Sequence, residues 1–179
     1  MIGLPEAGEA RGAWHPSGRA ARERLSGAES GGRERAVSDG PEQTLSGRLP
    51  EALRGRLALP VICAPMFIVS GPELVIAQCL SGVVGSFPAL NARPAALLDE
   101  WLTRITRTLA EARAADPSRK VAPFAGNQIV HASNDRLAQD VEACVRHQVP
   151  IIITSLRAPD AVIRPVHAYG GVVFHDVTT

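Results

Sequence analysis

Aromatic residues are scarce in this chain of 179 residues, at 4% of the composition, and the net charge is only +1. Surfaces that bind nucleic acids need basic side chains clustered along the phosphates and aromatic side chains that stack on bases. Basic and acidic residues are instead interspersed throughout this sequence. The composition therefore predicts no nucleic-acid partner.

Long hydrophobic runs are also missing. The longest apolar stretch, residues 57–69, is interrupted by Pro60 and Pro65 and is shorter than the roughly 18 residues that indicate a membrane span. The N-terminus has neither the charged start nor the apolar segment of a signal peptide. We therefore expect a cytoplasmic protein with no membrane partner.

Cysteine is rare, and the three residues present are Cys63, Cys79 and Cys144. They are widely spaced, odd in number and each set in an apolar segment, so a disulfide framework or a metal site is not expected. Free cysteine is among the most buried residue types. The sequence predicts three buried, reduced thiols and no metal ion.

Large apolar residues are few at the start of the chain. Nine of the 16 glycines lie in residues 1–50, together with seven arginines and seven acidic residues. Such a segment can bury little apolar surface to offset the entropy of ordering. We therefore expect a disordered, low-complexity extension over residues 1–46 and one folded domain over residues 50–179.

The rest of the chain alternates short apolar runs with amphipathic stretches. Strands are expected to start near residues 60, 83, 121, 150 and 172, which is the spacing of βα units. Helices are expected over 72–80 and 97–112, then after a cap at Ser133-Asn134-Asp135, and from Pro159-Asp160 onward.

The strands are continuously apolar, which is typical of a parallel α/β sheet. Two architectures fit this order of elements: an open five-stranded sheet, or about five of the eight units of a (β/α)₈ TIM barrel. The phosphate-binding patterns GxGxxG, directly after the first strand, and GxxxxGK[ST] are both absent.

In either architecture, small molecules bind at the C-terminal ends of the strands. The first strand ends in Ala64-Pro65-Met66, which is either a strand leaving the sheet or an apolar platform under a planar ligand, with nearby backbone groups free to bond it. Asn127 ends the third strand as a turn residue or a ligand contact, and Gly126 would allow close backbone approach there. Thr154 ends the fourth strand and is a further candidate contact for a bound cofactor.

His175 is the histidine that adjoins an acid, Asp176, at an expected strand end. Histidine is a suitable general acid or base near neutral pH. Neighbouring strand residues point to opposite faces, so these two side chains cannot form a dyad with each other. His175 is therefore a candidate catalytic residue if its side chain is the one that faces the site.

Four segments resemble the nitronate monooxygenase family, formerly called 2-nitropropane dioxygenases. They are LPVICAPMFIVSGPELVIA at 59–77, GVVGSFPALNAR at 82–93, PFAGNQIVH at 123–131 and HAYGGVVFHDVTT at 167–179. The resemblance extends over residues 53–179, and four segments in the right order and spacing make it specific.

The resemblance implies an FMN-dependent TIM barrel that oxidises alkyl nitronates with O₂ to a carbonyl compound and nitrite. It implies that Ala64-Pro65-Met66 and Asn127 lie at the flavin. The family's Gly-Gly-His-x-Gly segment, with the catalytic histidine, and its phosphate-binding glycine loops come after the fifth strand and are absent from this sequence. We therefore expect an N-terminal part of the enzyme, with weak or no FMN affinity and no turnover alone.

Two other hypotheses remain open. The Ala-Pro-Met turn also occurs in flavin-dependent enoyl-thioester reductases, and an NAD(P)H-oxidation assay separates that activity from nitronate oxidation. A non-catalytic fragment, or a scaffold that binds a partner through open sheet edges, belongs to another class. A flavin absorbance spectrum and size-exclusion chromatography test that third hypothesis. The sequence predicts neither the physiological nitronate nor the oligomeric state.

Overall fold

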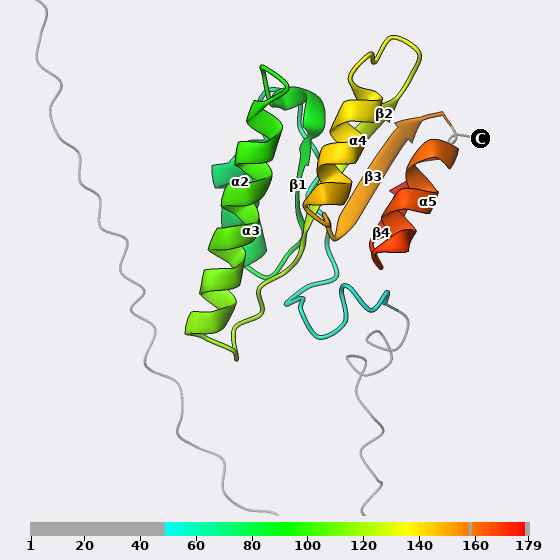
Figure 1. The fold of residues 1–179 in the computed structure, drawn as a ribbon. Helices are drawn as coiled ribbons and strands as arrows, with labels where there is room; N and C mark the ends of the chain where they lie inside the picture. Colours follow the sequence, from blue (N-terminus) through cyan, green and yellow to red (C-terminus); the bar gives the residue numbers. More distant parts are fainter. Residues whose placement is uncertain (1–48, 158, 178–179) are drawn as a thin grey trace, which may run out of the picture. The chain divides into compact units, whose positions relative to one another are not determined.

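Figure 1 shows the fold in a computed structural model, which describes residues 49–157 and 159–177. The expected extension over residues 1–46 lies outside the described residues. Helices and strands alternate along the described chain, as the sequence predicts. They are α2 (Pro72–Leu80), β1 (Gly85–Pro88), the short 3₁₀ helix η1 (Ala89–Asn91), α3 (Leu97–Ala115), β2 (Phe124–Val130), α4 (Leu137–Arg146), β3 (Ile151–Leu156), α5 (Asp160–Ala168) and β4 (Val172–His175).

The four strands form one parallel sheet in the order β1-β2-β3-β4. The helices pack on one face of this sheet, where their buried side chains join those of the strands in a common core (Figure 1). A doubly wound sheet would carry helices on both faces, whereas a barrel has sequential strands and a single outer helix layer. The architecture is therefore that of part of a TIM barrel, and the alternative of an open sheet wound on both faces does not fit the described residues.

The first expected strand, near residue 60, is reduced to a single parallel bridge between Ile62 and Val84. Cys63 N donates to Val84 O at 2.8 Å, and Val84 N donates to Val61 O at 3.0 Å. Proline cannot donate to a ladder, and Pro60 and Pro65 flank this segment. The segment therefore lies beside β1, where the first expected strand should be, but its regular pairing is limited to this bridge.

The helix-facing core is built around the apolar stripe of α3. Leu98, Ile105 and Leu109 are fully buried there, as the spacing of three and four residues predicts. The Phe87 ring of β1 meets the Trp101 ring edge-on, with centroids 5.7 Å apart. This packing holds α3 against the start of the sheet.

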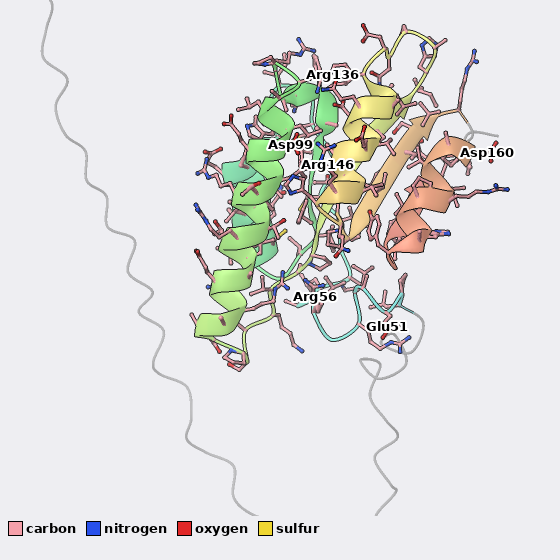
Figure 2. All side chains as sticks on the ribbon, in the orientation of Figure 1. Glu51, Arg56, Asp99, Arg136, Arg146 and Asp160 are labelled. Carbon is pink, nitrogen blue, oxygen red and sulfur yellow. The ribbon has the colours of Figure 1, made fainter. Side chains whose placement is uncertain are left out.

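An ion pair joins α3 to α4 at their surface. Arg146 Nη2 lies 2.9 Å from Asp99 Oδ1, and the two side chains point toward each other in Figure 2. His147 Nε2 lies 2.9 Å from the same carboxylate oxygen. Arg146 and His147, at the end of α4, therefore share the Asp99 carboxylate of α3.

The opposite face of the sheet is closed at its N-terminal end by the segment that precedes the first expected strand. Val84, Ala125 and Ile151 point to this face and are buried together with Leu53. Leu57 packs against the same cluster. This cluster covers the N-terminal ends of the strands and does not include their C-terminal ends.

The start of α4 differs from the expectation. The helix begins at Leu137, and its first turn has no side-chain cap. Asn134 instead accepts a hydrogen bond from Arg136 N at 3.2 Å and donates one to Ile129 O at 2.9 Å. Asn134 thus caps the turn that leads into the helix, as expected for this segment, but α4 itself begins later, after Arg136.

Within the described residues, no helix combines the length and the apolar character that crossing a bilayer requires.

Candidate functional site

Asn127 is the middle residue of β2 and not its end as expected, because the strand continues to Val130 along β3. It is 4% exposed, and its register partner in β1 is Pro88, the last residue of that strand. Its Nδ2 donates to Ile153 O at 3.2 Å and to Ser155 Oγ at 3.1 Å. Among residues 49–157 and 159–177, no group donates a hydrogen bond to its Oδ1. An amide oxygen has two lone pairs, so Asn127 can accept a hydrogen bond from an N–H group of a ligand.

The neighbours of Asn127 show which face of the sheet it occupies. Gln128 Nε2 lies 3.3 Å from Cys144 Sγ of α4, and a Cβ built on Gly126 would lie 3.7 Å from the same sulfur. Both therefore face the helices, and Asn127 faces away from them. The expectation that Gly126 opens space for a ligand is wrong on this point, because its missing side chain lies under α4.

The segment Ala64-Pro65-Met66 leaves the sheet beside β1. Ala64 is exposed, Pro65 is half-buried and Met66 is 41% exposed, so the segment presents apolar surface. Met66 N donates to Ser70 Oγ at 3.0 Å, and Met66 O accepts from Asn91 Nδ2 at 3.0 Å. The segment thus has the apolar surface that a platform would need, but the expected free backbone groups are not found at Met66, where both are paired within the chain.

This segment and Asn127 lie at the same edge of the sheet. Ile62 bridges Val84 on one side of β1, and Pro88 of β1 is the register partner of Asn127 on the other. Ser86 Oγ donates to Cys63 O and ties the residue just before the segment to β1. Since neighbouring strands lie roughly 4.8 Å apart, the bridged residue Ile62, just before this segment, and β2 are about 10 Å apart. The structure thus brings two of the predicted elements together across one strand.

Thr154 and His175 form a separate pair. They are register partners in β3 and β4, and Thr154 Oγ1 lies 3.0 Å from His175 Nδ1. The same ring nitrogen lies 3.0 Å from Thr154 O, and Thr154 is fully buried. Ile153 and Phe174, one residue earlier in each strand, belong to the cluster on the face opposite the helices. Thr154 and His175 therefore lie on the helix-facing side, which Asn127 does not share.

Ser70 lies two residues before the helix expected over 72–80. In the structure it is fully buried, and its hydroxyl accepts from Met66 N. The sequence signal for this contact is a polar side chain directly after the apolar run 66–69. The contact between Ser70 and Met66 depends on a turn that only the folded chain defines.

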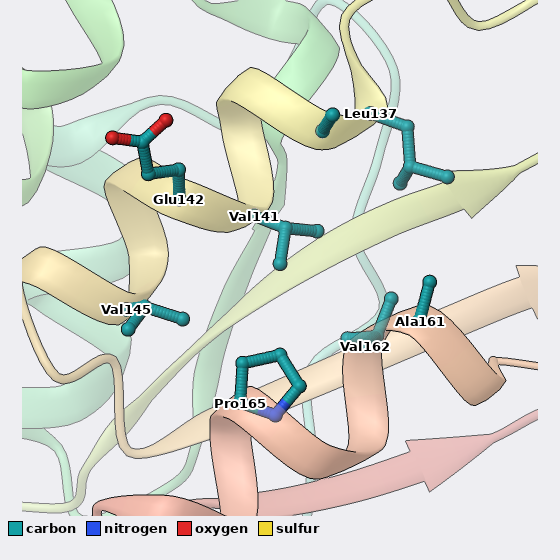
Figure 3. A pocket seen from close by; sticks show the side chains of 8 residues that line it. Leu137, Val141, Glu142, Val145, Ala161, Val162 and Pro165 are labelled. Carbon is teal, nitrogen blue, oxygen red and sulfur yellow. The ribbon is translucent and has the colours of Figure 1, made fainter.

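A hollow lies on the helix layer, between α4 and α5 (Figure 3). It has a volume of about 400 Å³, and Glu142 is its charged lining residue. The other lining residues are apolar: Leu137, Ala138, Val141, Val145, Ala161, Val162 and Pro165. None of the predicted site residues lines this groove. Nowhere in the described residues do three or more His, Cys, Asp or Glu side chains gather as a metal site would require.

No protein-family model matches the chain, and no curated protein matches it. Among solved structures, it is similar to FabK from Thermotoga maritima, with a TM-score of 0.56 and 19% identity over 69% of this chain and 35% of FabK. A single-residue mutant of that FabK gives a TM-score of 0.54 and 18% identity, over 69% of this chain and 37% of its own. The chain thus spans about a third of the length of these structures, and the likeness shows that it has the fold of part of a TIM barrel.

Proposed function

We propose that the C-terminal edge of the sheet binds the ring of FMN, as part of a nitronate monooxygenase that converts alkyl nitronates and O₂ to carbonyl compounds and nitrite. The observation that carries the proposal is Asn127, whose Nδ2 is held by β3 while its Oδ1 stays open as an acceptor. A flavin ring carries an imide N–H that requires such an acceptor. The four segments that resemble the family support the nitronate reaction.

Each element of this edge has a separate role in the proposal. Ala64-Pro65-Met66 offers apolar side-chain surface to the flat face of the ring, and Asn127 fixes the ring edge by a hydrogen bond. Bound FMN would supply the redox chemistry between the nitronate and O₂. The chain's own residues bind and orient the ring.

We propose that Thr154 and His175 stabilise the pairing of β3 with β4 and do not contact the flavin ring. Their mutual contact and the burial of Thr154 support this assignment. In this proposal, general acid or base chemistry at the nitronate is supplied by a group other than His175.

A flavin-dependent enoyl-thioester reductase is the second candidate. The likeness to FabK supports it as well as it supports a nitronate monooxygenase. Both candidates share the flavin ring site and differ in what reacts there, so flavin binding tests the site and product formation chooses between the reactions.

The test of the site is a fluorescence titration of the chain with lumiflavin, which has the ring but no phosphate, and with FMN. We expect weak, saturable binding of both with similar affinity, because the assigned contacts reach only the ring. Asn127→Ala should weaken binding roughly 2- to 12-fold, the scale of one net hydrogen bond. Gln128→Leu is the matched control, since Gln128 faces α4, and it should leave the affinity unchanged. Absence of saturable binding, or equal losses in both variants, would contradict the proposed site.

The test of the reaction uses the chain with excess FMN under air. Nitrite formed from an alkyl nitronate supports the monooxygenase. Oxidation of NAD(P)H that depends on an enoyl thioester supports the reductase instead. The binding titration does not depend on turnover and is therefore the decisive test of the site.

A further inference from the structure

The turn at residues 66–70, directly after the proposed ring platform, contains a strained residue. Ile68 has φ +68° and is 82% exposed. A β-branched residue is disfavoured in the left-handed region, and the exposed side chain has little packing to offset that cost. Some other interaction must hold the turn in this conformation.

Asn91, at the end of η1, supplies that interaction. Its Oδ1 accepts from Ile68 N at 3.0 Å, and its Nδ2 donates to Met66 O at 3.0 Å and to Ser70 O at 2.9 Å. One side chain thus uses its acceptor and both of its donors on a single turn more than 20 residues earlier in the sequence. Within the turn, Ser70 Oγ also accepts from Met66 N.

The element that carries Asn91 is itself anchored to α4. Arg136 Nη1 donates to Ala92 O at 2.8 Å, immediately after Asn91, and Arg136 Nη2 lies 3.0 Å from Asp140 Oδ1. Asp140 is 1% exposed, so this ion pair is fixed in the fold. Arg136 therefore fixes the backbone next to Asn91, and the Asn91 side chain in turn binds the 66–70 turn.

We propose that Asn91 is a positioning residue that maintains the strained turn at 66–70 and thereby sets the place of Met66 beside the flavin ring. The first part rests on the hydrogen bonds and φ angle alone, and only the second part rests on the proposed function. No other polar side chain type of this length matches one N–H and two carbonyls at once: aspartate lacks the donors, and leucine lacks all three groups.

The experiment is hydrogen exchange of the 66–70 turn in the full chain without flavin, arranged as a double-mutant cycle. Asn91→Ala should speed exchange of the Met66 and Ile68 amides about tenfold or more, since more than one net hydrogen bond is lost. Ile68→Gly removes the strain, because glycine adopts positive φ without penalty. In the Ile68→Gly background, Asn91→Ala should therefore have a clearly smaller effect.

Val69→Gly is the matched control, because Val69 has no positive φ and glycine there only loosens the chain. It should speed exchange by itself and should not reduce the effect of Asn91→Ala. Equal effects of Asn91→Ala in both glycine backgrounds, or exchange within twofold of the unmodified chain, would overturn the proposal. If Asn91→Ala unfolds the chain, the single variants decide: Ile68→Gly exchanging as fast as Val69→Gly would also overturn it.

A lumiflavin titration of Asn91→Ala then separates this inference from the proposed function. We expect weaker ring binding than in the unmodified chain, although Asn127 is intact. If the cycle shows the expected coupling but the unmodified chain binds no lumiflavin, the proposed function fails and the role of Asn91 in the turn stands. If lumiflavin binds and the cycle shows no coupling, the Asn91 proposal alone fails.

Discussion

The contact between α2 and β1 leads to a sharp prediction for Gly85. A Cβ at this position would lie 2.5 Å from Val75 O, a backbone atom of α2, and 3.1 Å from Cys79 Sγ. Ordinary contact begins at 3.4 Å, so the helix backbone would have to retreat by up to about 0.9 Å. Val75 and Cys79 are both fully buried, so that movement would disturb the core. Gly85→Ala should therefore destabilise the chain.

Gly126 of β2 provides the matched comparison. A Cβ there would meet Cys144 Sγ at 3.7 Å and Ile152 Cδ1 at 3.8 Å, which are ordinary contacts. Neither Gly85 nor Gly126 has a positive φ, so alanine is compatible with both backbones. Gly126→Ala should be neutral or stabilising by about 0.4–1 kcal/mol, because alanine lowers the entropy of the unfolded chain.

Urea unfolding followed by circular dichroism measures the difference. Overpacking costs roughly 1–3 kcal/mol, from which the entropy gain of alanine is subtracted, so Gly85→Ala should lose about 1–2 kcal/mol. With a slope near 2 kcal/mol per molar urea, its midpoint should fall by about 0.5–1 M, while that of Gly126→Ala stays or rises. Equal midpoints for the two variants, or the reverse order, would refute this account of the α2–β1 contact.

Two further predictions concern titratable groups. The hydrogen bond from Arg146 holds the pKa of Asp99 below its usual value, so this carboxylate stabilises the fold above about pH 3.9, and the contribution is lost as the pH falls through the lowered pKa. Unfolding curves should show Asp99→Asn as less stable than the unmodified chain at pH 6, with the gap closing in acid, and a gap that is the same at pH 3 would contradict it. Burial raises the pKa of Cys79 to about 11 and that of Cys144 to about 12, so iodoacetamide at pH 8 should modify the half-buried Cys63 first. Mass spectrometry that finds Cys144 modified as fast as Cys63 in the folded chain would argue against this packing.

Much of the fold could be predicted because its elements have local signals. The helix expected over 72–80 begins at Pro72 and ends at Leu80, and the β-branched run at 151 opens β3. The first strand was harder to predict because its length depends on the partner strand and not on its own apolar residues. Only Ile62 and Val84 form a bridge there, although the whole segment is apolar.

The candidate site could be predicted only in part. Strand alternation shows that His175 and Asp176 face opposite ways, but strands that are apolar on both sides do not reveal which face carries the helices. The structure places His175 with Thr154 on the helix-facing side, away from Asn127. The contacts of Asn91 span more than 20 residues of sequence, so no local pattern could reveal them.

The measurement that tests the proposed site most directly is a map of backbone amide chemical shifts during a lumiflavin titration of the chain. We predict that the amides of Met66 and Asn127 shift together with one saturation curve. The amides of Val121, at the opposite end of the sheet, and of Val141, in the groove between α4 and α5, should stay in place. Shifts concentrated at Val141, or no saturable shifts at Met66 and Asn127, would contradict a flavin ring site at the C-terminal edge of the sheet.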